Sequence, residues 1–353
     1  MASKSEKRLE RAEKVRVRRK WHWGTFGHFV TVLFTLIITV VVIVVMVCGQ
    51  FFLGPSQAAS DAMVQTLHQS SALKFVPYLY LYEHVSEALT RSEVVSNEEV
   101  TDTSLITVKA RTPKNYDAAD EVEEFDENGL RLEEVKGATY HGYMLIVEDP
   151  SRVTVGVSSK GFSSSKPGKY VDEIMASYNA LAGMNAGAFS DSGGSGNGGT
   201  PMGMVYSEGK RYCGYNSDYK VMAGFDENDI LHVGAFTTAQ CDEMGIRDAS
   251  AFGPALIVNG VPSVAEDKGL NPRTAIGQRA DGAVLMLVID GRQANSLGAT
   301  IADLINIMSD YGAINACNMD GGSSTCMYMY GKKINDGMTI SVGRHLPTAW
   351  IVK

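Results

Sequence analysis

The longest uncharged stretch of the chain constrains its fold most. Trp21–Ser60 contains no Asp, Glu, Lys or Arg, and Phe26–Leu53 consists almost wholly of Val, Ile, Leu, Phe and Thr. About 20 apolar residues span the hydrocarbon core of a bilayer, so we expect a transmembrane signal anchor over residues 24–53. Trp21 and Trp23 precede this run, where aromatic side chains commonly sit at the membrane interface.

Charge is distributed unevenly around the apolar run. Residues 1–20 hold nine Lys or Arg against three Glu, whereas the whole chain carries a formal net charge of −8. Because positive residues tend to stay on the cytoplasmic side, we expect residues 1–23 to form a basic cytoplasmic tail of a single-pass cell-membrane protein. The body should then be extracytoplasmic. Its acidic character argues against a nucleic-acid partner, since phosphate backbones require neutralising Lys and Arg.

A cleaved signal peptide is the competing interpretation of the apolar run. Ala58-Ala59 offers the small residues that a signal protease prefers. The apolar region of a signal peptide is usually only about 7 to 15 residues long, however, so the sequence favours an uncleaved anchor.

Beyond the anchor, composition predicts a stalk and then a body. Residues 54–103 are expected to form a juxtamembrane stalk and linker, helical over 58–93 except at Pro77. Residues 104–353 should form one α+β domain, a single mixed-sheet body with one late β-α-β crossover. A helix is predicted at 170–180. Strands are predicted at 104–110, 142–148, 152–158, 181–184, 204–206, 221–225, 230–233, 255–258 and 274–276.

The late crossover carries two aspartates. Apolar runs at 283–289 and 313–319 end in Asp290 and Asp320, and a helix between them can be capped by Thr300 and ended by Gly312. A strand, helix and strand normally form a right-handed parallel pair, so both acids should leave the sheet at its carboxyl edge. Since neighbouring strands lie about 4.8 Å apart, the two carboxylates should lie within several ångströms of each other.

Other chemistry-bearing residues also follow predicted strands. Arg273 and Arg292 could fork onto a phosphate or carboxylate. Glycine-rich loops let the backbone approach an anionic ligand, although each taken alone is as readily a surface turn. The further candidates are Asn185 and Gly187 in one loop, and Asn318, Gly321, Gly322, Ser323 and Ser324 in another.

The joint order of these loops resembles the phosphodiester glycosidase family. The resemblance rests on Asn185-Ala-Gly-Ala-Phe, Gly253-Pro, Pro272-Arg-Thr-Ala-Ile-Gly, Asp290-Gly-Arg and Asn318-Met-Asp-Gly-Gly-Ser-Ser-Thr, and it extends to the tail Gly343-Arg-His-Leu-Pro-Thr-Ala. Members of that family include an enzyme that removes N-acetylglucosamine from a sugar 1-phosphate diester, and many membrane-anchored bacterial members are associated with exopolysaccharide. Members often have three successive glycines where this chain has Gly321-Gly322-Ser323.

The resemblance implies hydrolysis of a glycosyl-1-phosphodiester in a cell-surface or imported glycan. Such a reaction stabilises an oxocarbenium-like sugar and a departing phosphate. We assign Asp320 as nucleophile or base with Asp290 as its partner, and Arg273 and Arg292 to phosphate. Asn185 and Asn318, with the glycines and serines listed above, would hold sugar hydroxyls or phosphate oxygens.

Two other functions use the same groups. The body could bind or assemble phosphorylated exopolysaccharide without turnover, or it could be a metal-dependent phosphodiesterase. The sequence requires no cofactor, although paired carboxylates would suit Ca²⁺ or Mg²⁺. His232 and His345 could act as acids or bases, but packed histidines are commoner.

The cysteines leave their pairing open. Cys48 lies in the apolar run, and Cys213, Cys241, Cys317 and Cys326 are as readily four small buried side chains as one or two disulfides.

Overall fold

The computed structural model describes most of the chain. The described residues are 4–70, 73–79, 82–96, 99–108, 125–191, 195–214, 220–336 and 343–353, without the side chains of residues 4, 17–25, 53, 82–83 and 220. The side chains of Trp21 and Trp23, for which we predicted an interfacial role, are therefore outside the described part of the chain. Residues 109 and 110 of the first predicted strand also lie outside the described residues.

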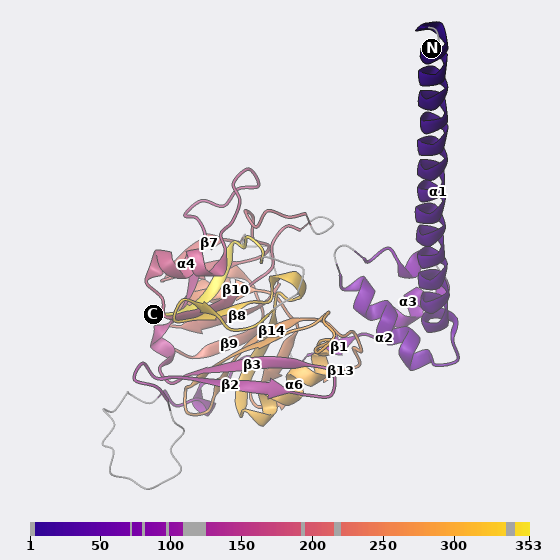
Figure 1. The fold of residues 1–353 in the computed structure, drawn as a ribbon. Coiled ribbons are helices and arrows are strands. Elements are labelled where there is room, and N and C mark those ends of the chain that lie inside the picture. The colour runs from indigo at the N-terminus through magenta and orange to yellow at the C-terminus, as the bar shows by residue number, and fades with distance from the viewer. Residues whose placement is uncertain are drawn as a thin grey trace. The chain divides into compact units, whose positions relative to one another are not determined.

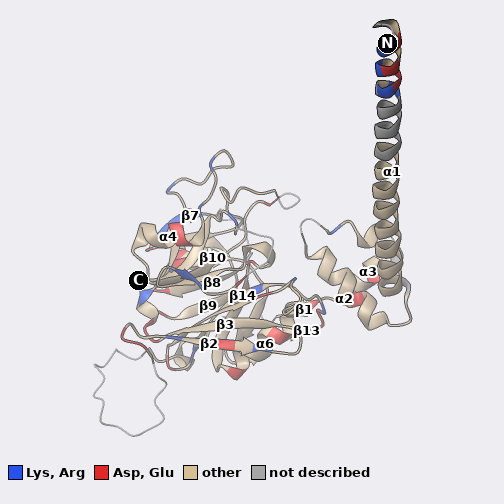
Figure 2. Ribbon diagram, in the orientation of Figure 1, with Lys and Arg blue, Asp and Glu red and all other residues tan. Residues whose placement is uncertain are grey.

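The chain forms two compact units, Met1–Ser60 and Asp61–Lys353. The first contains helix α1 (Lys4–Leu53), whose apolar part, Phe26–Phe52, is largely solvent-exposed and long enough to cross a membrane. In the described part of the chain this is the single helix with that length and composition. In Figure 2 the ribbon is coloured blue and red for charged residues at the amino-terminal end of α1, and the apolar part, Phe26–Phe52, contains no charged residue.

The second unit is an α+β body, as predicted, and its strands form three main sheets (Figure 1). The largest contains, in spatial order, β12 (Val261–Pro262), β11 (Ala255–Val258), β16 (Ala313–Met319), β14 (Arg273–Arg279), β15 (Val284–Ile289), β3 (His141–Val147) and β2 (Leu130–Lys136). A second sheet contains β7 (Lys210–Cys213), β6 (Val205–Ser207), β10 (Ile246–Ala251), β8 (Lys220–Asp226) and β9 (Leu231–Phe236). A third contains β18 (Lys332–Lys333), β17 (Met327–Met329), β5 (Ala182–Asn185), β19 (Thr348–Val352) and β4 (Val153–Val157).

The largest sheet is buried on both faces, which explains the continuous apolar sequence of its central strands. Along β15, Val284, Met286 and Val288 face a core shared with the other two sheets. The alternate residues Leu285, Leu287 and Ile289 face a second core that includes α6 (Ile301–Asp310). Side chains alternate between the two faces of a strand, so a strand covered on both faces must be apolar throughout.

Smaller helices cover the outer faces of the other sheets. Helix α4 (Val171–Tyr178) packs Val171, Ile174 and Met175 against Ala349 and Ile351 of β19. Helix α5 (Thr238–Glu243) contributes Cys241 to a core with residues of β8 and β10.

Most predicted elements are present, with one exception among the described residues. The start of the strand predicted at 104–110 is wrong, because Thr103–Leu105 form a short 3₁₀ helix capped by Asp102. Several elements in this unit were not predicted, among them β2, β7, β10, β17, β19 and α5.

The predicted crossover is correct in its elements and wrong in its pairing. Thr300 caps α6 through a capping box with Asp303, and Gly312 follows it at a φ of +78°. However, β15 and β16 are not neighbours, because β14 lies between them and pairs antiparallel with both. The two strands still run in the same direction and end at the same edge. Two strand spacings separate those ends, roughly 10 Å, instead of the single spacing that we expected.

The segment predicted as a stalk belongs largely to the second unit, which begins at Asp61. It contains the later part of α2 (Gln57–His68), the turn η1 (Pro77–Leu79) and α3 (Tyr82–Thr90). Arg91 forms a two-bond ion pair with Asp61, at 2.8 and 2.9 Å. The short strand β1 (Val94–Val95) then pairs with β13 (Val264–Ala265), so this segment is packed onto the body.

Candidate active site

A cavity of about 900 Å³ lies in the second unit, where β15 and β16 end and β14 begins. Its lining includes Arg273 at the start of β14, Arg292 after β15 and Asp320 after β16. Three of the four charged side chains assigned to the site therefore line one cavity. A volume of this size is within the range of ordinary small-molecule sites.

Asp320 is fixed through its backbone. Its N–H donates to the carbonyl of Ala186 at 3.0 Å, and its own carbonyl accepts from Asn185 Nδ2 at 2.5 Å. The Asn185 side chain is fully buried and its Oδ1 also accepts from Thr274 Oγ1 and from the Cys326 N–H. Asn185 does not line the cavity, so the predicted contact to a sugar hydroxyl or phosphate oxygen is wrong. Its buried amide instead holds the loop that carries Asp320.

The carboxylate of Asp320 has a raised pKa. Burial raises its pKa to about 6, although a hydrogen bond from Ser324 and the charge of Arg344 oppose this shift. Its Oδ2 is buried and has no hydrogen-bond partner among the described residues. A carboxylate whose pKa lies this close to neutrality suits general acid or base catalysis.

The two predicted arginines lie close enough to influence each other. Burial lowers the pKa of Arg273, the nearby Asp267 carboxylate opposes this shift, and the charge of Arg292 adds to it. Burial also lowers the pKa of Arg292. Both guanidinium groups remain cationic at neutral pH because the starting value is far above 7. Together they make part of the cavity lining positively charged, which suits the binding of a phosphate.

A third arginine, Arg344, lines the cavity and was not assigned from the sequence. It forms a two-bond ion pair with Asp191, at 2.6 and 2.8 Å, and its guanidinium lies 4.8 Å from the centre of the Phe189 ring. Asp191 also lines the cavity and raises the pKa of Asp320 through its charge. The tail sequence around Gly343-Arg344 was the available signal for this residue.

The end of β16 and the loop after it contribute residues to the cavity, as predicted. Asn318, Gly321, Gly322, Ser323 and Ser324 all line the cavity. Asn318 donates from Nδ2 to the Gly253 carbonyl at 2.7 Å, whereas its buried Oδ1 has no partner among the described residues. Gly322 adopts a φ of +61°, and a Cβ there would come 3.5 Å from Arg292 Nη1. Glycine therefore permits both this turn and the close approach of the arginine.

Asp290 does not line the cavity, which corrects the prediction that its carboxylate would lie beside that of Asp320. Its Oδ1 accepts from Asn335 Nδ2 at 2.9 Å, and its Oδ2 accepts from the Asp336 N–H at 3.3 Å. His141 Nδ1 lies 3.8 Å from the same carboxylate. The two carboxylates are separated because strand β14 lies between β15 and β16. Asp290 instead stabilises the turn at residues 335–336 through its two hydrogen bonds.

Gly187 is also outside the cavity lining. A Cβ at this position would come 2.2 Å from Ser250 Oγ and 2.7 Å from the Ala251 carbonyl. The glycine is therefore required for close packing against β10, and the predicted ligand contact is replaced by this packing role.

A family model matches the part of the chain that contains the candidate site residues. The family model described as phosphodiester glycosidase matches residues 178–353. These residues belong to the phosphodiester glycosidase family. The match covers every residue of the predicted site and supports a glycosidase-like hydrolytic function.

A solved structure and a curated sequence are also similar to this chain. The catalytic domain of zebrafish N-acetylglucosamine-1-phosphodiester alpha-N-acetylglucosaminidase, auto-inhibited by its pro-peptide, has the same fold, with a TM-score of 0.54 and 17% identity over 65% of this chain and 85% of that chain. The SPbeta prophage-derived uncharacterized protein YomE of Bacillus subtilis is 38% identical over 98 residues, which are 26% of this chain and 15% of YomE. The match to YomE thus spans a small part of that relative.

The candidate histidines and the cysteines lie outside the cavity lining. His232 is buried and its Nε2 lies 3.0 Å from Asp226 Oδ2, while the His345 ring lies 4.3 Å from that of Tyr170. All five cysteines are free in this structure, which resolves the pairing left open by the sequence. Among the described residues, no group of three or more His, Cys, Asp or Glu is arranged to hold a metal ion.

Proposed function

We propose that this protein hydrolyses the glycosidic bond of sugar 1-phosphodiesters. The observation that supports this most strongly is the convergence of Arg273, Arg292 and Asp320 in one cavity of the family-matched domain. A diester of this kind joins a neutral sugar to an anionic phosphate, and the cavity offers a carboxylate for the first and cations for the second.

In the proposed reaction, a water oxygen bonds to the anomeric carbon as the bond from that carbon to the phosphate oxygen breaks. The bonding electron pair leaves with the phosphate, and the Asp320 carboxylate accepts a proton from the water. Arg273 and Arg292 stabilise the charge that develops on the departing phosphate. A phosphate monoester is a good leaving group and needs little acid assistance.

The remaining cavity groups orient these reactants. Ser324 hydrogen-bonds to the Asp320 carboxylate, and the ion pair of Arg344 with Asp191 lines the same cavity. The free Oδ1 of Asn318 can accept a hydrogen bond from a sugar hydroxyl, since it has no partner among the described residues. Asp290 has no place in this scheme as a reacting group.

We also propose that α1 anchors the enzyme in the cell membrane, with residues 1–23 in the cytoplasm and the body outside. The length and apolar composition of Phe26–Phe52 support anchoring, and the basic residues before it support this orientation. An extracytoplasmic location would give the cavity access to cell-surface or imported glycans.

The products of a chosen substrate test the reaction. Full-length protein in detergent is incubated with sugar 1-(4-nitrophenyl phosphate) diesters that differ in sugar and anomer, with and without a chelator. The proposal predicts free sugar and 4-nitrophenyl phosphate. Immediate release of 4-nitrophenol would show cleavage on the phosphorus side, and binding without products would favour a glycan-assembly role; either result contradicts the proposal.

A further inference from the structure

The cavity includes a side chain from far outside the family-matched region. Gln69 follows α2, and its N–H donates to the Gln65 carbonyl at 3.0 Å, which continues the helical pattern. Gln69 nevertheless lines the same cavity as Arg273 and Asp320. The sequence gave this segment no chemical role, because nothing in its local pattern indicates which part of the body it contacts.

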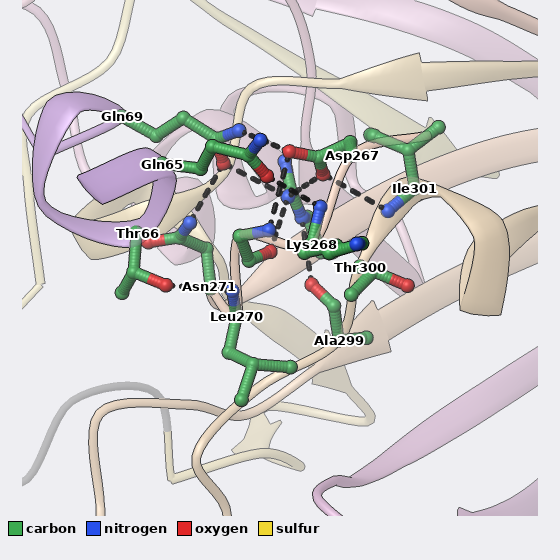
Figure 3. A network of polar contacts seen from close by, with 12 residues as sticks. Gln65, Thr66, Gln69, Asp267, Lys268, Leu270, Asn271, Ala299, Thr300 and Ile301 are labelled. Atoms are coloured by element: carbon green, nitrogen blue, oxygen red, sulfur yellow. Dashed lines mark hydrogen bonds and ion pairs between the residues drawn. The ribbon is translucent and has the colours of Figure 1, made fainter. Parts of the chain in front are cut away.

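Both ends of the Gln69 amide are used. Its Oε1 accepts from Arg273 Nη2 at 2.9 Å and from Asn271 Nδ2 at 2.7 Å, while its Nε2 donates to Asp267 Oδ1 at 2.7 Å. Figure 3 shows this side chain reaching from the helix into a network with Asp267 and Asn271. The three partners all line the cavity.

These bonds fix one side of the Arg273 guanidinium. Nη2 donates to Gln69, to Asp267 Oδ2 and to the Gly269 carbonyl, at 2.9 to 3.0 Å, and Nε donates to the Ala299 carbonyl. Nη1 has no hydrogen-bond partner within the described ranges. The network therefore holds the guanidinium from one side and keeps the donors of Nη1 for a ligand.

The same amide reaches the second arginine through one intermediate. Asn271 donates to Gln69 from Nδ2, and its Oδ1 accepts from Arg292 Nη2 at 2.8 Å. Loss of the Gln69 side chain would thus release Asn271 as well as Arg273. One residue of the segment after α2 supports both cations of the proposed phosphate site.

Independent contacts hold the helix in place. Gln65 Oε1 accepts from the Lys268 N–H at 2.6 Å, and Thr66 Oγ1 accepts from the Leu270 N–H at 2.9 Å. The opposite end of the Gln65 amide donates to the Ala88 carbonyl at 2.7 Å. Docking of α2 therefore does not depend on Gln69, so Gln69 can be changed while the helix stays attached.

We propose that Gln69 is a positioning residue that orients Arg273 and Arg292 toward the phosphate group of the substrate, so that the segment following the membrane helix is a component of the active site. This inference deepens the proposed function and rests on it for the identity of the ligand. A body lacking the segment would contain every residue of the family-matched region and still have a poorly organised phosphate site.

The test compares Gln69→Ala with Gln65→Ala in the full-length protein. Each change removes a side-chain amide that hydrogen-bonds to the body, one from the buried Gln65 of α2 and one from Gln69 just after this helix, but only the Gln69 amide contacts cavity residues. Inorganic phosphate binding is measured by calorimetry, and KM and kcat are measured with the 4-nitrophenyl diester that the wild type cleaves best. Loss of a hydrogen bond to a charged group predicts that Gln69→Ala raises the Kd of phosphate and the KM about tenfold, with kcat changed less. Gln65→Ala should lower Tm and leave Kd and KM unchanged.

The inference would be overturned by equal phosphate affinity in Gln69→Ala and wild type, by equal weakening in both variants, or by tighter binding and faster turnover in Gln69→Ala. The last result would make Gln69 a cover over the site. The phosphate titration keeps this test separate from the proposed reaction, because it decides the role of Gln69 even if no diester is cleaved. Diester cleavage with unchanged KM in Gln69→Ala would instead preserve the function and remove the positioning role.

Discussion

Asp290 and Asp320 follow two strands that run in the same direction and end at the same edge of the largest sheet. One carboxylate bonds to Asn335 and the Asp336 backbone, whereas the other faces the cavity with a pKa raised to about 6. Both are followed by glycine, so the local motif does not distinguish them. The difference teaches that a strand-end acid becomes part of a site only when neighbouring elements leave it without structural partners.

The largest expected effect separates the two acids directly. Asp320→Asn should lower kcat by a hundredfold to a thousandfold, because the variant loses the proposed proton acceptor. Asp290→Asn should keep kcat within about threefold and lower Tm, since its carboxylate accepts two structural hydrogen bonds. Steady-state kinetics and thermal unfolding of the two variants check this, and equal losses of kcat would erase the distinction between the acids.

The cations offer the next comparison. Arg292→Ala should lower kcat/KM about a hundredfold, because a donor to the departing phosphate is lost. Arg247, which pairs with Asp229 and Asp248 outside the cavity lining, is a matched control whose replacement by Ala should lower Tm and spare kcat/KM. A variant at Arg292 with normal kcat/KM would exclude it from phosphate binding.

The buried carboxylate should also cost stability when it is ionised. Because the folded pKa of Asp320, about 6, is above its usual 3.8, the wild type should lose stability as pH rises through this interval. Asp320→Asn should therefore be more stable than wild type at pH 8, by about 3 kcal/mol, and similar to it near pH 4. Denaturant unfolding at both pH values measures this; a variant less stable at pH 8 would argue that the charged form is well accommodated.

The smallest expected effect is a shift in the pH profile. If Asp320 acts as a base, kcat/KM should rise through a pKa near 6. Asp191→Asn removes a negative charge that raises the pKa of Asp320 and frees Arg344, whose charge lowers it, so this limb should move to lower pH. A limb that stays in place in Asp191→Asn would assign it to a different group.

Sequence reasoning succeeded where local pattern determines structure. The capping pair Thr300 and Asp303, the apolar stripe of α6 and the terminator Gly312 are each local signals, and each is present. The strands before Asp290 and Asp320 were equally clear because both faces of the sheet are covered.

Local sequence signals could not predict the order of the strands in the sheet or which distant segments reach the cavity. The insertion of β14 between β15 and β16 depends on pairing energies across the whole sheet, which no local periodicity reveals. Gln69 and Arg344 reach the cavity from segments that only tertiary packing brings there. Asn185 was misjudged because a polar residue at a strand end can serve the backbone as readily as a ligand.

The fate of water oxygen tests the central claim most directly. The full-length protein is allowed to cleave its best sugar 1-phosphodiester in ¹⁸O-labelled water, and the phosphate monoester is examined by ³¹P NMR and mass spectrometry. Attack at the anomeric carbon leaves the original bridging oxygen on phosphorus, so the account predicts an unlabelled phosphate monoester and free sugar. Label on the phosphorus-containing product would show attack at phosphorus and contradict the account.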